Sequence, residues 1–308
     1  MLTEYNAPFV IGMDGGGTKT KACAADLDGH VFDTVIGASM NINSQGQEGV
    51  LQNMAAIYQT LQQHGARWEN LKAICLGAAG VSNPLTRETL TESVSAAGIL
   101  VTPIIFGDHQ AALYGAHGKG KGMILIAGTG SICYGVDGEG KEARTGGWGH
   151  LIDDEGSGYA LGRDILSAVV QAEDGRIPPT CMWEAVKEQL QINTIQELIQ
   201  FVYSPTTGKK EIAALAPIIM KGLEAGEEAA DAILEKAADK LSKLVVPVAK
   251  KLHMEGGELA FCGSIITKNE ALISKLTRKV SAVLPSLQCI QPKQDAAVGA
   301  VLRGLEDI

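Results

Sequence analysis

Residues 11–20, IGMDGGGTKT, place three consecutive glycines between an aspartate and two threonines. The apolar run FVIGM predicts a buried strand, after which Gly15–Gly17 allow a sharp turn that exposes backbone N–H groups. Such groups attract anions, Thr18 adds a hydroxyl and Lys19 a positive charge, while Asp14 is suited to a hydrated divalent cation. Phosphate with magnesium is one interpretation, and a hairpin turn whose glycines serve conformation alone is the other.

Asp108 has the type and the place of a catalytic base. It follows the apolar run TPIIFG and is therefore expected at the C-terminal end of a strand, where ligand sites of α/β proteins lie. Phosphoryl transfer to a hydroxyl needs a group that accepts the hydroxyl proton. Because HQAALYGAH predicts a helix directly afterwards, Asp108 is also a candidate N-cap, and the two roles are compatible.

Composition narrows the class of protein. The chain has 308 residues, 45% hydrophobic and 20% charged, which is ordinary for a soluble globular protein of one or two domains. A net charge of −9 argues against a general nucleic-acid binder, which needs a basic face, and favours a small-molecule ligand. No secretion signal and no apolar run of membrane-spanning length is found, so we expect neither secretion nor a membrane span.

The cysteines and histidines show no metal-ligand spacing. The six cysteines occur singly, without C-x-x-C, and we expect them to be reduced core residues of a cytoplasmic protein: Cys23, Cys75, Cys133, Cys181, Cys262 and Cys289. The six histidines lack H-x-x-x-H spacing, so a structural zinc site is not expected.

The pattern of strands and helices predicts an α/β fold with an internal duplication. Three short β-type runs, separated by glycine turns, occupy residues 9–37 and predict antiparallel strands, and a strand–helix–strand pattern over residues 71–108 predicts parallel pairing. MILIAGTGSICYGVDGEG then repeats the order of the opening segment: strand, Gly/Thr turn, strand, Asp-Gly turn. Residues 157–252 are mostly helical in pattern.

Five segments together carry a family resemblance. They are DGGGTKT, GDHQAAL, AGTGSICYG, GGWGHLIDDEGSGYALGRD and FCGSI, in this order, and the fourth, residues 146–164, is the most specific. The chain resembles the N-acetylglucosamine kinase and BadF/BadG/BcrA/BcrD ATPase group of the actin-like sugar kinase superfamily. The resemblance implies two actin-like (ribonuclease H-like) domains with a duplicated β-hairpin core around an interdomain ATP and sugar cleft.

The same resemblance implies domain limits and partners. We expect an N-terminal domain over residues 1–117, a second domain with a helical insertion over 118–293, and a C-terminal helix, 294–308, that packs back on the first domain. We also expect a homodimer, ATP with Mg²⁺ as cofactors and a sugar as substrate.

The resemblance assigns residues to the nucleotide. The phosphate side comprises Gly16, Gly17, Thr18, Lys19, Thr129 and Gly130, and the nucleoside side Gly263 and Ser264. Asp14 would orient Mg²⁺ through water.

On the sugar side the expected residues, with Asp108 as the base, are Asn41, Ser131, Trp148, Gly149, His150 and Asp154. Asn43, Asp153 and Glu155 would replace their neighbours if the register shifted by a residue or two. Trp148 would either stack on the sugar or lie in the core beneath its loop.

One residue departs from the family pattern. Ile132 stands where the animal kinases carry a sugar-facing asparagine, and it cannot form a side-chain hydrogen bond. N-acetylglucosamine and glucosamine are the expected substrates, and glucose and N-acetylmuramic acid remain open. The alternative function is the activator ATPase of a 2-hydroxyacyl-CoA dehydratase or benzoyl-CoA reductase, which requires iron–sulfur ligation by surface thiolates.

Overall fold

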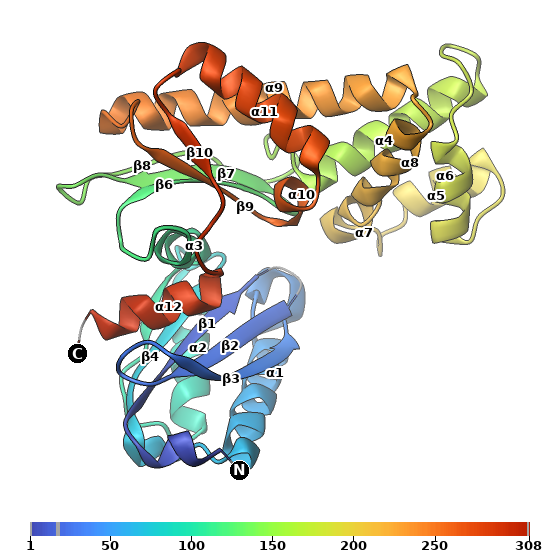
Figure 1. Ribbon diagram of the computed structural model, residues 1–308. Helices are drawn as coiled ribbons and strands as arrows, with labels where there is room; N and C mark the ends of the chain where they lie inside the picture. The colour runs from blue at the N-terminus through green and yellow to red at the C-terminus, as the bar shows by residue number, and fades with distance from the viewer. Residues whose placement is uncertain (1, 17–18, 307) are drawn as a thin grey trace. The chain divides into compact units, whose positions relative to one another are not determined.

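The computed structural model describes residues 2–16, 19–306 and 308. Contacts divide the chain into two compact units, Met1–Gly122 with Pro292–Ile308, and Met123–Gln291. The strands of the described residues form two five-stranded sheets flanked by helices, one sheet in each unit (Figure 1). The predicted α/β class is confirmed.

The first sheet has the strand order β3-β2-β1-β4-β5. Its strands are β1 (Phe9–Gly15), β2 (Lys19–Ala25), β3 (Val31–Ala38), β4 (Leu71–Ala78) and β5 (Ile104–Gly107). As expected, β1, β2 and β3 pair antiparallel, while β4 pairs parallel with both β1 and β5. The parallel strands β1, β4 and β5 therefore end at one edge, where Asp14 and Asp108 lie.

Helices cover both faces of this sheet because the side chains of β1 alternate. Ile11 and Met13 lie in the core formed with α1 (Ile42–His64) and α2 (Pro84–Ala96). Val10, on the other face, packs against α12 (Ala296–Leu305), which also lies beside α3 (Asp108–His117). A Cβ on Gly12 would lie 2.2 Å from the backbone nitrogen of Val301, so only glycine lets α12 approach β1 this closely.

The second sheet repeats the first. Its strands are β6 (Gly122–Ala127), β7 (Ser131–Val136), β8 (Glu142–Gly146), β9 (Glu258–Cys262) and β10 (Gln288–Ile290). Read as β8-β7-β6-β9-β10, their order matches that of the first sheet. The internal duplication predicted from the repeated glycine turns is thus confirmed.

The second unit is rich in helices. Its core helix is α9 (Glu228–Leu252), which packs on β7 and β8 and continues through Pro247. The other helical segments are α4 (Gly158–Glu173), α5 (Met182–Leu190), α6 (Ile195–Val202), α7 (Lys209–Ala213), η3 (Ala216–Ile218), α8 (Ile219–Glu224), α10 (Ser264–Thr267) and α11 (Glu270–Val283). Among the helices of the described segments, none has the length and apolar character needed to cross a membrane.

The expectation that all six cysteines are core residues is wrong in part. All six lie in the described residues and none forms a disulfide bond; four are buried, but Cys289 is half-buried and Cys181 is exposed. Cys181 precedes α5 as its N-cap, at the surface of the helical segment rather than in a strand. The neighbouring residues in the sequence, Thr180 and Met182, do not indicate that the Cys181 side chain is exposed.

Candidate active site

The first glycine hairpin is held by a buried serine. Gly17 and Thr18 lie outside the described residues, whereas Lys19 is exposed at the start of β2. The Ser39 hydroxyl donates to the Gly16 carbonyl at 2.8 Å and accepts the Asn41 N–H at 3.1 Å. Ser39 therefore links the predicted phosphate hairpin to a predicted sugar residue, a role that its sequence neighbourhood did not indicate.

Three carboxylates gather at the strand ends of the first unit. Burial, together with the negative charges of Asp108 and Asp295, raises the pKa of Asp14 to about 7, against the opposing charges of Lys19 and Lys21. The Lys21 ammonium is bonded to the Asp295 carboxylate. A divalent cation would relieve the repulsion around Asp14, so this donor set fits Mg²⁺.

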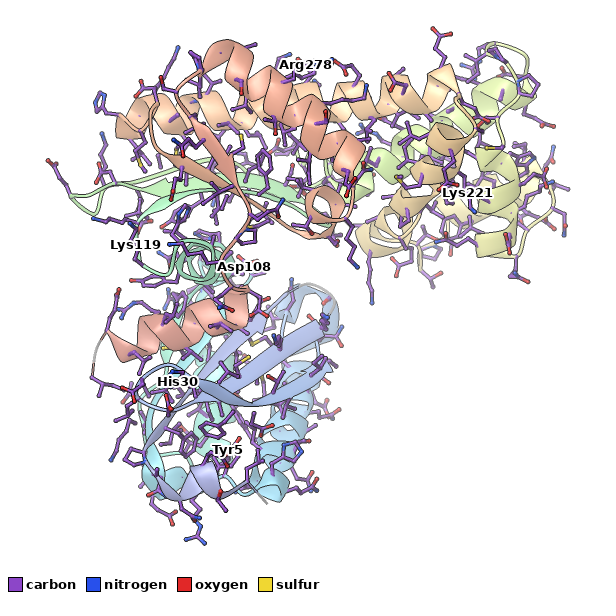
Figure 2. The ribbon with its side chains drawn as sticks, in the orientation of Figure 1. Tyr5, His30, Asp108, Lys119, Lys221 and Arg278 are labelled. Carbon is purple, nitrogen blue, oxygen red and sulfur yellow. The ribbon has the colours of Figure 1, made fainter. Side chains whose placement is uncertain are left out.

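Asp108 opens α3 with one oxygen free (Figure 2). Gly107 is the N-cap of that helix, so the interpretation of Asp108 as the N-cap is wrong. Its Oδ1 accepts the His109 N–H at 2.9 Å, whereas Oδ2 accepts no hydrogen bond from the part of the chain that the structure describes. The side chain is 41% exposed, so Oδ2 is accessible to a ligand hydroxyl.

The second glycine turn, residues 128–131, presents free amides. The Gly128 N–H donates to the Gly130 carbonyl at 2.9 Å, and the Gly158 and Tyr159 N–H groups donate to the Gly128 and Thr129 carbonyls at 2.7 and 3.4 Å. These bonds tie the turn to the start of α4. Within the described ranges the Thr129 and Gly130 N–H groups have no acceptor, so the turn fits an anion such as phosphate.

The predicted nucleoside residues lie beside this turn. β9 pairs parallel with β6, with Cys262 opposite Ile126, and Gly263 follows with a positive φ of 86°. Ser264 then begins α10. The structure therefore brings Gly263 and Ser264 next to the start of the 128–131 turn. The two motifs are far apart in the sequence, so neither one predicts this contact by itself.

Trp148 is at the surface of the second unit. Its side chain is 64% exposed, and the Arg144 Cζ lies 4.0 Å from its ring centroid. The alternative that it is a core aromatic is wrong. The Trp148 backbone N–H donates to Asp153 Oδ2 at 3.1 Å, and the His150 ring packs edge-on against Tyr159 with 4.7 Å between the ring centroids, so the loop around Gly149 is braced at both ends.

The three consecutive acidic residues 153–155 have separate partners. Asp153 accepts the Trp148 N–H, and Glu155 accepts from Arg163 at 3.1 Å. Asp154 is 2% exposed: its Oδ1 accepts the Ser131 N–H at 3.2 Å, and its Oδ2 lies 2.6 Å from Lys209 Nζ. No motif indicated Lys209, which is distant in the sequence.

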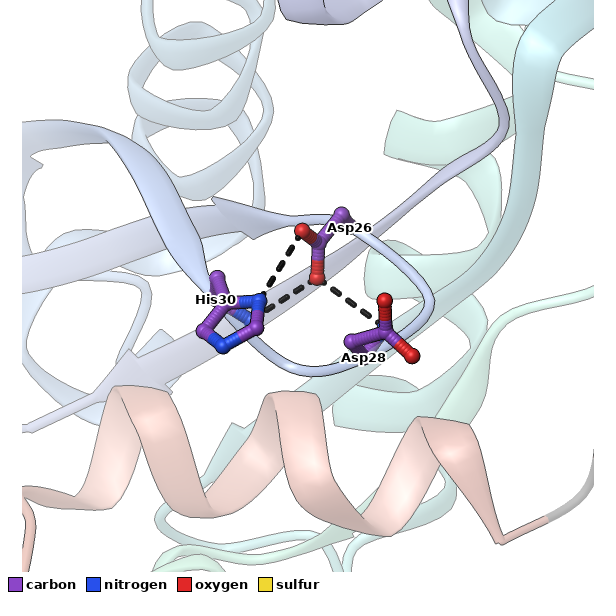
Figure 3. A group of neighbouring side chains, drawn as sticks. All are labelled: Asp26, Asp28 and His30. Atoms are coloured by element: carbon purple, nitrogen blue, oxygen red, sulfur yellow. Dashed lines mark hydrogen bonds and ion pairs between the residues drawn. The ribbon is translucent and has the colours of Figure 1, made fainter.

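A second acidic group belongs to a turn. Asp26, Asp28 and His30 have potential ligand atoms within 4.8 Å of one another, and they are the only such group among the described residues (Figure 3). The Asp26 Oδ1 accepts the N–H groups of Asp28 and His30 at 3.0 and 2.9 Å. These bonds account for the cluster as the side-chain-stabilised turn between β2 and β3.

Two sheets of matching strand order, each opening with a glycine turn, define the actin-like ATPase and sugar kinase class of fold. A solved structure described as a candidate N-acetylglucosamine kinase from Chromobacterium violaceum is similar, with a TM-score of 0.76, 27% identity and coverage of 96% of this chain and 98% of that one. The BadF/BadG/BcrA/BcrD ATPase family profile matches residues 11–304. The chain therefore belongs to this family.

Two relatives match almost the full length. The chain is 34% identical over 299 residues to the N-acetylmuramic acid/N-acetylglucosamine kinase of Clostridium acetobutylicum, covering 96% of this chain and 97% of that protein. It is 32% identical over 312 residues to the N-acetyl-D-glucosamine kinase of Dictyostelium discoideum, with the same coverage.

Proposed function

We propose that the protein transfers the γ-phosphoryl group of ATP to a hydroxyl of an amino sugar, N-acetylglucosamine or glucosamine. The observation that carries the proposal is the hydrogen bond from the Ser131 N–H to Asp154. It joins the turn with anion-binding amides to the most specific sugar-kinase segment, residues 146–164. The names of the two full-length relatives support the same class of reaction.

In this proposal both glycine turns hold the phosphates. The contributing groups are Gly16, Gly17, Thr18 and Lys19 of the first turn and the amides of Thr129 and Gly130 in the second. Gly263 and Ser264 lie on the nucleoside side. Asp14 would hold Mg²⁺ through water, and the ion, when bound, would neutralise part of the phosphate charge.

Asp108 is the proposed general base. Its free Oδ2 takes the proton of the attacking sugar hydroxyl as the new O–P bond forms and the bond from the γ-phosphorus to the β–γ bridging oxygen breaks. The products are the sugar phosphate and ADP, and the proton remains on Asp108 until solvent removes it.

The sugar-side residues are Asn41, Ser131, Trp148, Gly149, His150 and Asp154. The Arg144 guanidinium covers one face of the exposed Trp148 ring, and the opposite face is offered to the sugar, because apolar sugar faces and aromatic rings pack well. Ile132, near the start of β7, pairs with Gly146 of β8 and adds an apolar side chain beside the start of the 146–164 segment. This apolar neighbour is compatible with an N-acetyl methyl group and leaves N-acetylmuramic acid and glucose as candidates.

The alternative activator ATPase has less support from the geometry. Its iron–sulfur cluster needs thiolates that reach a common point at the surface. Cys23, Cys75, Cys133 and Cys262 are buried, and the exposed Cys181 lies in the helical segment of the second unit. No observation in the described residues favours that function over the kinase.

A coupled assay of ADP release tests the proposal. Purified protein with ATP and Mg²⁺ would be given N-acetylglucosamine, glucosamine, N-acetylmuramic acid and glucose in turn, and the phosphorylated product would be identified by mass spectrometry. We expect sugar-dependent ADP release with an amino sugar. ATP hydrolysis that no sugar stimulates, or a preparation that reduces a partner protein instead, would contradict the proposal.

A further inference from the structure

Lys209 lies against the 128–131 turn although it belongs to no recognised motif. Its Nζ is 2.6 Å from Asp154 Oδ2, and a Cβ on Gly130 would lie 2.7 Å from that Nζ. The turn, the carboxylate and the ammonium are therefore packed in one group. We propose that Lys209 is a positioning residue of the turn, acting through Asp154, and the proposal rests on the function proposed for the turn in binding nucleotide phosphates.

The position of Lys209 is set by the packing of two helix backbones and does not depend on its ion pair with Asp154. Lys209 is the first residue of α7, and α7 packs on α4. A Cβ on Gly162 of α4 would lie 2.0 Å from the Ile212 carbonyl oxygen of α7, so the two helices touch through their backbones. This contact fixes the backbone at the start of α7. The Lys209 side chain therefore extends towards Asp154 from a fixed Cα position.

Asp154 requires a cation at this point. Its side chain is 3% exposed, and its backbone has a φ of 61°, in the left-handed region that aspartate adopts infrequently. A buried carboxylate is costly unless it is paired and hydrogen-bonded, and removing one partner of a buried pair is strongly destabilising. Lys209 supplies the charge, and the Ser131 N–H supplies the hydrogen bond.

The function of the turn depends on this arrangement. The Ser131 N–H is held by Asp154, so the adjacent amides of Thr129 and Gly130 keep the orientation that leaves them free. Without the ammonium, the buried Asp154 carboxylate would lack its counter-ion and would shift towards solvent, so its hold on the Ser131 N–H would loosen. The amides would then meet a phosphate with poorer alignment, and nucleotide binding would weaken.

The test measures nucleotide binding without turnover. ADP affinity would be determined by isothermal titration calorimetry for wild type, for Lys209→Met, which removes the charge at similar length, and for Lys209→Arg, which retains it. Lys210→Met, at the exposed neighbouring position, is the matched control. We expect Lys209→Met to weaken ADP binding about tenfold, Lys209→Arg to restore it to within about threefold of wild type, and Lys210→Met to have no effect.

A double-mutant cycle separates action through Asp154 from direct action. Asp154→Asn with Lys209→Met leaves no unpaired buried charge and guards against loss of folding by Lys209→Met alone. We expect the double variant to bind ADP no more weakly than either single variant. Independent, multiplying losses, or a Lys209→Met affinity within twofold of wild type, would overturn the proposal.

The failures of the two proposals are distinguishable. Wild type that binds ADP but phosphorylates no sugar overturns the proposed function alone, and the binding cycle still decides the role of Lys209. Wild type that binds no ADP overturns both proposals, because the turn then has no nucleotide to position.

Discussion

Asp14 and Lys21 lie opposite each other in the β1–β2 pairing, yet the Lys21 ammonium is bonded to Asp295, the N-cap of α12. The first hairpin is thus tied by charge to the last helix of the chain. Asp295 Oδ1 also accepts the Val298 N–H at 3.1 Å. The Asp295 carboxylate therefore caps α12 and also fixes the position of the Lys21 ammonium beside Asp14.

Two substitutions of Asp295 separate its role as the cap of α12 from its ion pair with Lys21. Asp295→Ala removes the cap and the ion pair, and we expect a loss of about 1–2 kcal/mol in the free energy of unfolding measured with urea. Asp295→Asn retains an acceptor for the cap, and because the half-exposed ion pair is worth little, its loss should be below about 1 kcal/mol. Equal losses in the two variants would contradict this division.

The raised pKa of Asp14 predicts that the folded protein becomes less stable as the pH rises. Its pKa is raised from 3.8 to about 7 by folding, so between these values the folded protein binds a proton that the unfolded chain has released. Stability from this group therefore falls as pH rises from about 4 to about 7, by at most about 4 kcal/mol and by less where water screens the site.

Asp14→Asn removes this dependence. We expect the variant to gain about 2 kcal/mol in unfolding free energy relative to wild type between about pH 5 and about pH 8. Mg²⁺ should stabilise wild type at the higher pH and have little effect on the variant. A difference between the two proteins that does not change with pH would show that Asp14 is not perturbed as described.

Asp108→Asn should remove catalysis and leave binding intact. The amide has nearly the shape of the carboxylate but cannot accept the proton of the sugar hydroxyl, so we expect kcat to fall about 100-fold to 10,000-fold. ADP affinity, measured by calorimetry, should remain within about twofold of wild type. Asp108→Ala gives a control without the hydrogen bond to the His109 N–H. A kcat within tenfold of wild type would assign the base elsewhere.

Gly12→Ala should destabilise the first unit. The new methyl group would lie 2.2 Å from Val301 N and 2.6 Å from the Ala297 carbonyl, and backbone atoms of a packed helix cannot move aside cheaply. We expect a loss of about 3 kcal/mol in unfolding free energy. Gly138→Ala, which meets nothing within 4 Å, is the matched control and should be nearly neutral.

Trp148→Ala should affect the sugar more than the fold. Because the side chain is 64% exposed, we expect a change in melting temperature below about 2 °C. Loss of a stacking surface should raise the KM for the sugar about tenfold while the KM for ATP is retained. Trp148→Phe keeps an aromatic face and should recover most of the affinity. A large fall in melting temperature would instead indicate a structural role.

Much of the fold follows from local sequence. The three antiparallel strands, the parallel strands after them and the repeat at residue 123 were predicted because turn glycines and apolar alternation act over only a few residues. The same reasoning placed Asp108 at the end of a strand. It named Asp108 as the candidate N-cap of α3 and missed Gly107, because both residues are acceptable N-caps and the choice depends on the backbone conformation at these positions.

The sequence by itself determined the elements, their duplicated order and the motifs that name the family. Only the tertiary structure decided which charges meet, since Lys209 reaches Asp154 and Lys21 reaches Asp295 from segments far apart in the chain. It also decided that Trp148 and Cys181 face solvent. Local propensity sets a residue's backbone state, whereas its partners and burial are set by how distant elements pack, and no short stretch of sequence contains that information.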